Sequence, residues 1–386
     1  MPRRDGLSAD TGCWYCRENS MISEIVKVSL AAGIWAILLY VLQRRIRTKQ
    51  RRVLLVVVFV LKLSVWVGLS YVLIGFDSVI TWRYPFVLGG LYVAVLADII
   101  RDVLFLLFVL FRKKQVFQKL SVLSTVLCTG FTLLYCVINM QLIFPEHFTF
   151  TSEKLQSAHT FVFMADLHYG TAQNKESVKR AFQEIGSLAP EFIVLGGDMT
   201  DEFTTREEME ELYAQLGSLD TPVYFIYGNH DNQDHAVYAF GAAYTEEELI
   251  EVLENNGITI LKDAYVPIAD DLILLGRETS SHPEKRAAVA DLPNWPEDAY
   301  LIGVDHSPYN PDEILALGAD LQLSGHTHDG QFLPMHLGNV INGYYVRGPY
   351  RVGKTDLLVT PGIGGWAVPL RNESHCVYEV VTLLPQ

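Results

Sequence analysis

Cysteine is scarce in this sequence, with five in 386 residues and only Cys376 after residue 150. That count excludes a small disulfide-dense scaffold, and it leaves the second half of the chain without an internal disulfide. Cys13 and Cys16 have the C-x-x-C spacing of half a metal site. A second pair is missing, so we interpret them as part of a reduced tail. Internal repeats and low-complexity tracts are absent too, which excludes a repeat architecture.

Positive charge is scarce after residue 150. Residues 151–386 contain 13 Lys and Arg against 36 Asp and Glu, a net charge of −23. Nucleic-acid binding needs a basic surface, so we expect no nucleic-acid partner. Residues 1–150 contain 17 Lys and Arg against 8 Asp and Glu, a net charge of +9, and are very apolar. This contrast indicates a membrane anchor followed by a soluble domain.

Long apolar runs occupy about 25–42, 53–74, 85–111 and 120–144. As a helix, each run of about 18 residues or more crosses a hydrocarbon core of about 30 Å. A soluble protein would need four successive helices that are apolar on every face, and the first run is too long for a cleaved signal peptide. We therefore predict four transmembrane helices.

The predicted organisation has four parts. Residues 1–20 are a tail for which disorder is one expectation, and translation from Met21 would remove it. Residues 21–145 are the four-helix transmembrane region, 146–158 a short polar connector, and 159–386 a soluble domain. The short connector predicts that the domain sits close to the membrane.

Loop charge predicts the orientation of a multi-pass protein in the cell membrane. Residues 44–52 and 112–119 are densely basic, whereas 75–84 contain only Asp77 and Arg83 as charged residues. Basic loops stay in the cytoplasm, so both termini and the soluble domain are expected outside it.

The third apolar run contains Asp98, Arg101 and Asp102, spaced to share one helical face. Charges at membrane depth are costly and often functional. An ion pair near the cytoplasmic end of a long tilted helix is the alternative that we favour.

After residue 159, short runs rich in Val, Ile, Phe and Tyr alternate with amphipathic, Glu-rich segments. Predicted strands are 160–166, 192–197, 222–227, 300–305, 321–324, 357–360 and 376–383, and predicted helices are 174–188, 205–217, 245–256 and 311–317. Residues 258–277 are typical of strand pairs. The pattern predicts an α/β domain with a mixed sheet, built as two packed sheets flanked by helices.

Polar ligand-type residues follow the predicted strands, often beside glycine. They are Asp166, His168, Asp198, Asn229, His230, Asp231, His306, His326 and His328. One such segment alone is weak evidence, because most buried histidines are hydrogen-bonded core residues. Several clusters in this order indicate a site for two divalent metal ions.

The series D-x-H, G-D, G-N-H-D, a lone His and G-H-T-H resembles the calcineurin-like metallophosphoesterase family over about residues 159–384. The segment Pro361–Gly365, followed by residues 368–371, resembles the membrane-anchored bacterial branch. The resemblance implies a four-layer αββα sandwich. Asp329 departs from it, because many relatives have glycine after G-H-T-H, and this change can alter the outer pocket.

By position, the resemblance implies two metal sites and a catalytic pair. Asp166, His168, Asp198 and His328 hold the first ion, and Asp198, Asn229, His306 and His326 hold the second. His230 donates a proton to the leaving oxygen or stabilises charge on the phosphorus, and Asp231 orients His230. Ligands of nitrogen and oxygen without thiolate suit Mn, Fe or Zn.

We therefore predict a membrane-anchored phosphoesterase that hydrolyses phosphate mono- or diesters by metal-bound hydroxide, with a lipid-linked or envelope phosphoester as one candidate substrate. A non-catalytic metal-binding scaffold or sensor on the same fold is the alternative. The apolar run 236–244 is either a packed helix or a lid. The lipid bilayer is the expected partner, and no oligomeric state is indicated.

Overall fold

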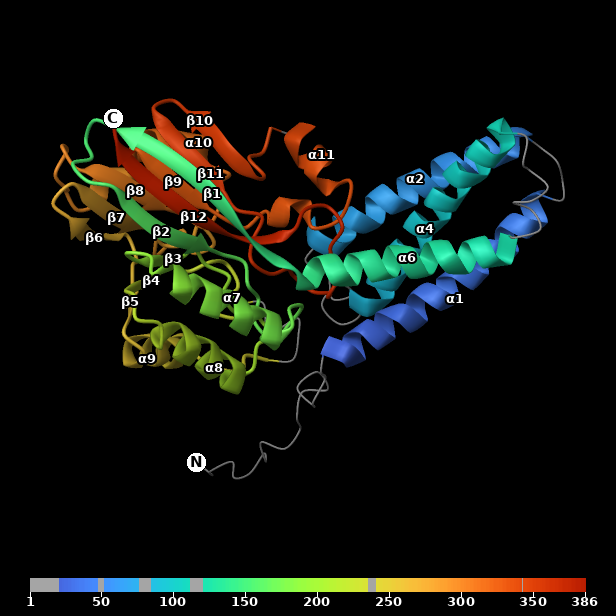
Figure 1. The fold of residues 1–386 in the computed structure, drawn as a ribbon, viewed down its shortest axis with the longest axis horizontal. Coiled ribbons are helices and arrows are strands. Elements are labelled where there is room, and N and C mark those ends of the chain that lie inside the picture. The colour runs from blue at the N-terminus through green and yellow to red at the C-terminus, as the bar shows by residue number, and fades with distance from the viewer. Residues whose placement is uncertain (1–20, 48–51, 76–84, 112–120, 235–240, 342) are drawn as a thin grey trace, which may run out of the picture.

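The computed structural model describes residues 21–47, 52–75, 85–111, 121–234, 241–341 and 343–386. Long helices occupy all four apolar runs: α1 (Met21–Arg47), α2 (Arg52–Gly75), α4 (Pro85–Leu110) and α6 (Ser121–Gln141). They pack side by side as a bundle that extends away from the rest of the chain (Figure 1). The predicted tail 1–20, residues 48–51 of the first basic loop, the whole second basic loop 112–119 and most of the run 236–244 lie outside the described residues.

Among the described residues, one helix is both long and apolar enough to cross a membrane, namely Val122–Gln141 in α6. Val26–Val41 and Val57–Ser70 are shorter apolar helices. α4 is long, but it contains three charged residues. The structure therefore has the four predicted helices, while its composition supports one membrane span among them.

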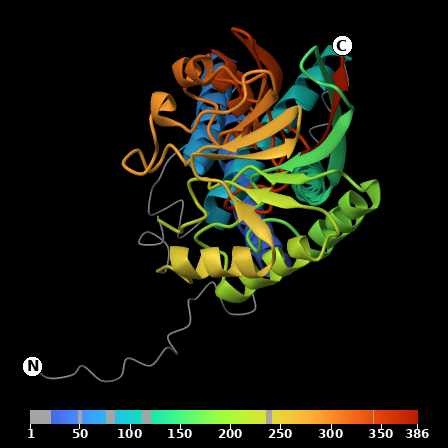
Figure 2. The same cartoon turned by 90° about the vertical axis from the view of Figure 1, so that its left-hand side faces the viewer.

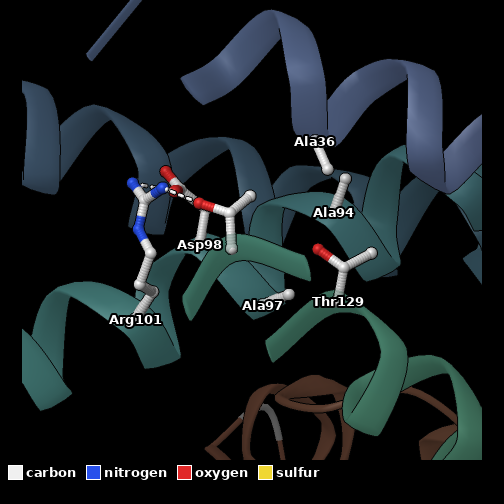
Figure 3. Close-up of a pocket in the computed structure, with 7 residues that line it drawn as sticks. Ala36, Ala94, Ala97, Asp98, Arg101 and Thr129 are labelled. Carbon is white, nitrogen blue, oxygen red and sulfur yellow. Dashed lines mark hydrogen bonds and ion pairs between the residues drawn. The ribbon is translucent and has the colours of Figure 1, made fainter. Parts of the chain in front are cut away.

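The charges of α4 belong to a cluster between helices (Figure 3). Arg101 forms an ion pair with Asp98, and Lys62 of α2 lies 2.7 Å from Asp98 and 2.5 Å from Asp102. Arg101 also donates to Thr125 of α6. The cluster contains two cations and two carboxylates, so burial leaves no net charge at this level of the bundle. The predicted Asp98–Arg101 pair is confirmed, and its partner Lys62 comes from a separate helix.

The prediction that residues 146–158 are only a connector is wrong, because more than half of them belong to a strand. Residues 143–152 form β1 (Ile143–Ser152), which pairs in parallel with β12 (Cys376–Pro385) along its whole length. Its side chains alternate in burial, and Phe148 and Phe150 pack on the core. The strand begins two residues after α6 ends, so the last helix of the bundle runs directly into the sheet (Figure 1).

Two sheets form the centre of the second half. The first has the strand order β1-β12-β2-β3-β4-β5, and the second has the order β10-β11-β9-β8-β7-β6. The bounds are β2 (His159–Met164), β3 (Ile193–Leu195), β4 (Val223–Phe225), β5 (Ile258–Ile260), β6 (Ala264–Ala269), β7 (Leu272–Gly276), β8 (Tyr300–Val304), β9 (Leu321–Ser324), β10 (Gly348–Val352) and β11 (Thr355–Val359). The mixed sheets and the strand pairs at 258–277 match the prediction.

The helices cover the outer faces of the sheets. α7 (Lys175–Leu188), α8 (Arg206–Gly217) and α9 (Glu246–Asn255) pack on the first sheet through one apolar core, and Figure 2 shows them along its lower side. A second core, which includes Phe161, Phe163 and Leu323, fills the space between the sheets. α10 (Pro311–Leu317) covers the second sheet. These four layers give the αββα order that the sequence resemblance implies.

The bundle and the sandwich share a buried junction. Tyr92 of α4 donates to the Leu333 carbonyl at 2.9 Å, and Asn139 of α6 donates to the carbonyls of Arg371 and Ser374 at 3.2 and 2.7 Å. Val368 and Leu370 join an apolar cluster with the helices. The bundle therefore contacts the loops that follow β9 and β11, close to one edge of the sandwich.

Arg371 organises this junction from inside. Its side chain is 0% exposed and donates to the carbonyls of Gly364, His328, Pro361 and Ser374 at 2.8, 2.7, 2.8 and 3.2 Å. Its backbone amide donates to the Cys136 carbonyl of α6 at 3.0 Å. A planar guanidinium reaches several fixed acceptors at once, which an ammonium group does not.

We expect Arg371→Lys to lower the free energy of unfolding by about 3 kcal/mol, because at least two charged hydrogen bonds are lost in a buried site. Thermal unfolding of the full chain measures this loss. Arg351→Lys is the matched control. Arg351 is 58% exposed and pairs with Asp356 on the surface, so its substitution should change stability by at most about 1 kcal/mol. Equal effects of the two substitutions would contradict the structural role of Arg371.

Candidate metal centre

The candidate residues follow strands whose carboxyl ends meet at one edge. β2, β3 and β4 are parallel neighbours, and they are followed by Asp166, Asp198 and Asn229 respectively. In the second sheet β8 and β9 are parallel neighbours, followed by His306 and His326. The two sheets are joined here, because the His326 amide donates to both carboxylate oxygens of Asp166 at 3.0 Å.

The backbone at this edge is turned sharply. The residues Asp166, His168, Asp198, His326 and His328 all have φ between 48° and 70°. A left-handed conformation is costly for a residue with a side chain, and such strain concentrates at functional sites. Here it turns the chain directly after each strand, so that the side chains point to a common centre rather than onward along the strand.

Six of the seven predicted metal ligands form two compact groups of buried or partly buried side chains. Asp166, His168 and His328 make the first group, and Asp198, His306 and His326 make the second. Asp198 Oδ2 lies 3.1 Å from His306 Nε2 and 3.9 Å from His168 Nε2, so one carboxylate faces both groups. The seventh residue, Asn229, follows β4 at the same edge.

In two histidines a neighbouring oxygen indicates which ring nitrogen carries the hydrogen. His306 Nδ1 lies 2.8 Å from the Gly196 carbonyl, which can only accept. His168 Nδ1 lies 3.2 Å from the carboxylate of Asp201. A neutral ring that donates from Nδ1 leaves Nε2 as a lone pair, and such partners are typical of metal-binding histidines. Both Nε2 atoms face Asp198, within the two groups.

Unpartnered acceptors at the centre fit bound cations. Asn229 Oδ1 is buried and has no hydrogen-bond partner among the described residues. His168 Nε2 and His328 Nε2 face each other at 3.3 Å, where a shared proton or a cation would satisfy both. Burial and His306 lower the pKa of His326 to about 3, and burial and His168 lower the pKa of His328 well below its usual range. Both rings are therefore neutral at pH 7 and can act as ligands.

His230 lies beside the two groups, but its partner differs from the prediction. Its Nδ1 is 2.8 Å from Glu202, whose carboxylate is buried. Burial alone would lower the pKa of His230, but Glu202 and Asp198 outweigh it and raise that pKa to about 10. The ring is then protonated near neutral pH.

Asp231 does not orient His230 as predicted. Its carboxylate accepts hydrogen bonds from the backbone amides of Gly228, Asp198, Met199 and Thr200, at 2.7, 2.8, 2.9 and 3.1 Å. Four amide donors occupy its acceptor sites, so it holds the two loops that carry Asp198 and Asn229. Glu202 takes the position that was predicted for Asp231.

Several residues of the centre were missed from the sequence. Asp201 and Glu202 lie within the run Gly197-Asp-Met-Thr-Asp-Glu202 and look like ordinary acidic residues before a helix. Only their burial, 0% and 5% exposed, reveals their roles. Trp366 stacks at a tilt beside His230, with ring centroids 6.1 Å apart. Asp329 contacts His336 and lies 3.7 Å from Arg347, which extends the polar rim beyond His328.

Comparison with known proteins gives a consistent result. Residues 159–330 match the family model described as calcineurin-like phosphoesterase. A transmembrane protein with metallophosphoesterase domain from Danio rerio is 27% identical over 234 residues, covering 55% of this chain and 50% of that protein. An uncharacterized metallophosphoesterase from Helicobacter pylori is 26% identical over 247 residues, covering 61% and 62%. A third, from Bacillus subtilis, is 25% identical over 240 residues, covering 58% and 78%.

The match spans about half the length of the Danio rerio relative and less than two thirds of the Helicobacter pylori relative. The family-model match, residues 159–330, contains the strand-end residues described above. Residues 159–330 are therefore similar to the calcineurin-like phosphoesterase family, and the relatives that the chain resembles carry metallophosphoesterase names.

Proposed function

We propose that this chain is a membrane-anchored phosphoesterase that uses two divalent metal ions to hydrolyse phosphate mono- or diesters. The observation that carries the proposal is the pair of adjoining ligand groups with Asp198 between them. A single structural metal would need one closed group of ligands. Two groups that share a carboxylate suit a site that handles phosphate.

When bound, two such ions lower the pKa of a shared water and neutralise the charge of the phosphate. The chain supplies their ligands: Asp166, His168, Asp198 and His328 for one ion, and Asp198, Asn229, His306 and His326 for the other. Histidine nitrogens and carboxylate or amide oxygens, with no thiolate among these ligands, favour Mn, Fe or Zn. Asn229 contributes a neutral oxygen, which limits the negative charge that an anionic substrate meets.

His230 is the proposed proton donor to the leaving oxygen. Its backbone amide donates to Asp198 Oδ1 at 2.9 Å, so His230 is held next to the carboxylate that both ions would share. The buried Glu202 keeps the ring oriented and charged. Trp366 limits the space on its other side. These contacts suit a general acid, which must be protonated at the working pH.

The membrane part of the proposal rests on the helix bundle. On this proposal α1, α2, α4 and α6 cross the membrane, the basic segments 44–52 and 112–119 of the sequence face the cytoplasm, and the domain lies outside. Exposed apolar side chains cover the described parts of the bundle, including Leu30, Leu61 and Phe131, at 64%, 57% and 68% exposed. The name of the Danio rerio relative supports membrane attachment. A lipid-linked or envelope phosphoester is the candidate substrate.

We expect Asp198→Asn to lower kcat/KM for bis(p-nitrophenyl) phosphate by at least about 100-fold, because it weakens both ligand groups. Metal analysis should show fewer than two ions per chain. Asp220→Asn is the matched control, since Asp220 is an exposed residue far from the centre. A wild-type chain that retains two ions without turnover would instead favour the non-catalytic scaffold.

We expect Glu202→Gln to move the basic limb of the pH–rate profile to lower pH. Glu202 raises the pKa of His230, so its loss lets the ring lose its proton earlier as the pH rises. The rate should fall by about 10- to 100-fold, and more for an alkyl phosphate than for a nitrophenyl phosphate, because a poor leaving group needs the proton more. The exposed Glu207→Gln serves as control. An unshifted basic limb would remove Glu202 from this role.

We expect a cysteine introduced at the exposed Glu153 (Glu153→Cys) to react with a membrane-impermeant maleimide in intact cells, because the domain lies outside the cytoplasm. The parent chain is labelled in parallel to account for its own cysteines. Labelling that requires cell lysis would place the domain in the cytoplasm.

A further inference from the structure

An exposed apolar stripe lies on α11 (Met335–Ile341), outside the metal centre. Leu337, Val340 and Ile341 are 58%, 45% and 75% exposed, and their spacing of three and four residues places them on one side of the helix. Met335 points inward and is 7% exposed. A contiguous apolar patch of this kind on a folded protein marks a surface that contacts another apolar phase.

The stripe lies where the bundle meets the sandwich. α11 packs against α2, and Figure 1 places it beside the end of that helix nearest the domain. Tyr92 of α4 fixes the preceding segment through the Leu333 carbonyl at 2.9 Å, and Phe332 packs into the cluster that the bundle helices form. The stripe is therefore continuous with the apolar surface of the bundle, at the level where that surface ends.

Two tyrosines connect α11 with the metal centre. Tyr344 follows the helix closely, and its ring centroid lies 4.9 Å from that of Tyr309. The Tyr309 ring in turn lies 5.3 Å from the His326 ring, edge to face. Both tyrosines are partly exposed, at 47% and 40%. An amphipathic ring with a polar tip suits the boundary between lipid and water.

We propose that α11 lies in the head-group region of the outer leaflet, and that Tyr344 and Tyr309 line the path from the bilayer to the metal centre. This proposal rests on the proposed function and specifies its substrate class: an amphiphile whose phosphoester reaches His326 while its acyl or isoprenoid chain stays in the membrane. The stripe carries no charged residue, so burial of its three aliphatic side chains in lipid is favourable. The occupant of the stripe is the lipid bilayer itself.

Photocrosslinking tests the lipid contact independently of catalysis. The full chain, reconstituted in phosphatidylcholine nanodiscs, carries p-benzoylphenylalanine in place of Ile341. In the control chain the same amino acid replaces Leu315, which is 51% exposed on α10 of the sandwich. We expect ultraviolet light to attach lipid to position 341 but not to position 315. Equal lipid attachment at both positions, or attachment of a protein at position 341, would overturn the proposal.

Inhibition kinetics tests the path. Nanodiscs that contain dioleoylphosphatidic acid should inhibit hydrolysis of soluble bis(p-nitrophenyl) phosphate, because the lipid phosphate reaches the same centre. Ile341→Asp should raise the inhibition constant of the lipid about tenfold, and Leu315→Asp should leave it unchanged. No inhibition of the wild-type chain, or equal effects of both substitutions, would overturn the path. If the wild-type chain does not hydrolyse the soluble substrate at all, the proposed phosphoesterase function is wrong. The crosslinking result can still be interpreted in that case.

Discussion

The carboxylate of Asp231 holds together the part of the structure on which the metal centre depends. It is fully buried and accepts hydrogen bonds from the amide groups of Gly228, Asp198, Met199 and Thr200. These amides belong to the turns after β3 and β4, where helical or sheet partners are unavailable. Without the carboxylate, four buried donors would be unsatisfied at a cost of about 1–3 kcal/mol each. Asp231 therefore helps to fix the position of Asp198 between the two ligand groups, together with the His230 amide that donates to Asp198 Oδ1.

Much of the sandwich could be predicted, because local patterns and tertiary structure agree there. Buried strands such as 161–164 are apolar throughout, and the helices after them begin with capping residues such as Thr205 and Thr245. The polar residues that end each strand could therefore be assigned to one edge. β1 was missed because Phe148 and Phe150 find their partners only across the sheet, in a strand more than 200 residues further along the chain.

The parts that could not be predicted depend on partners distant in sequence. Glu202 and Asp231 are both acidic residues near His230, and only the three-dimensional structure shows which one contacts the ring and which one contacts amides. The role of Lys62, which lies in an apolar helix, was missed for the same reason. Its value lies in neutralising Asp98 and Asp102 of a neighbouring helix, and no local pattern encodes such a pairing.

The contacts at the junction indicate that the helix bundle does more than anchor the sandwich. The Arg371 side chain donates to the His328 carbonyl, and its backbone amide donates to the Cys136 carbonyl in α6. One residue thus lies between the loop that carries His328 and the bundle helix α6. β1 adds a second connection, since the strand that continues from α6 is an edge of the first sheet. A cut near residue 150 would remove most of that strand and would also remove Tyr92, the hydrogen-bond partner of Asn372. The loop after β9 carries His326 and His328 and also contacts Tyr92 of the bundle through the Leu333 carbonyl, so the packing of these helices bears directly on the geometry of the candidate metal centre.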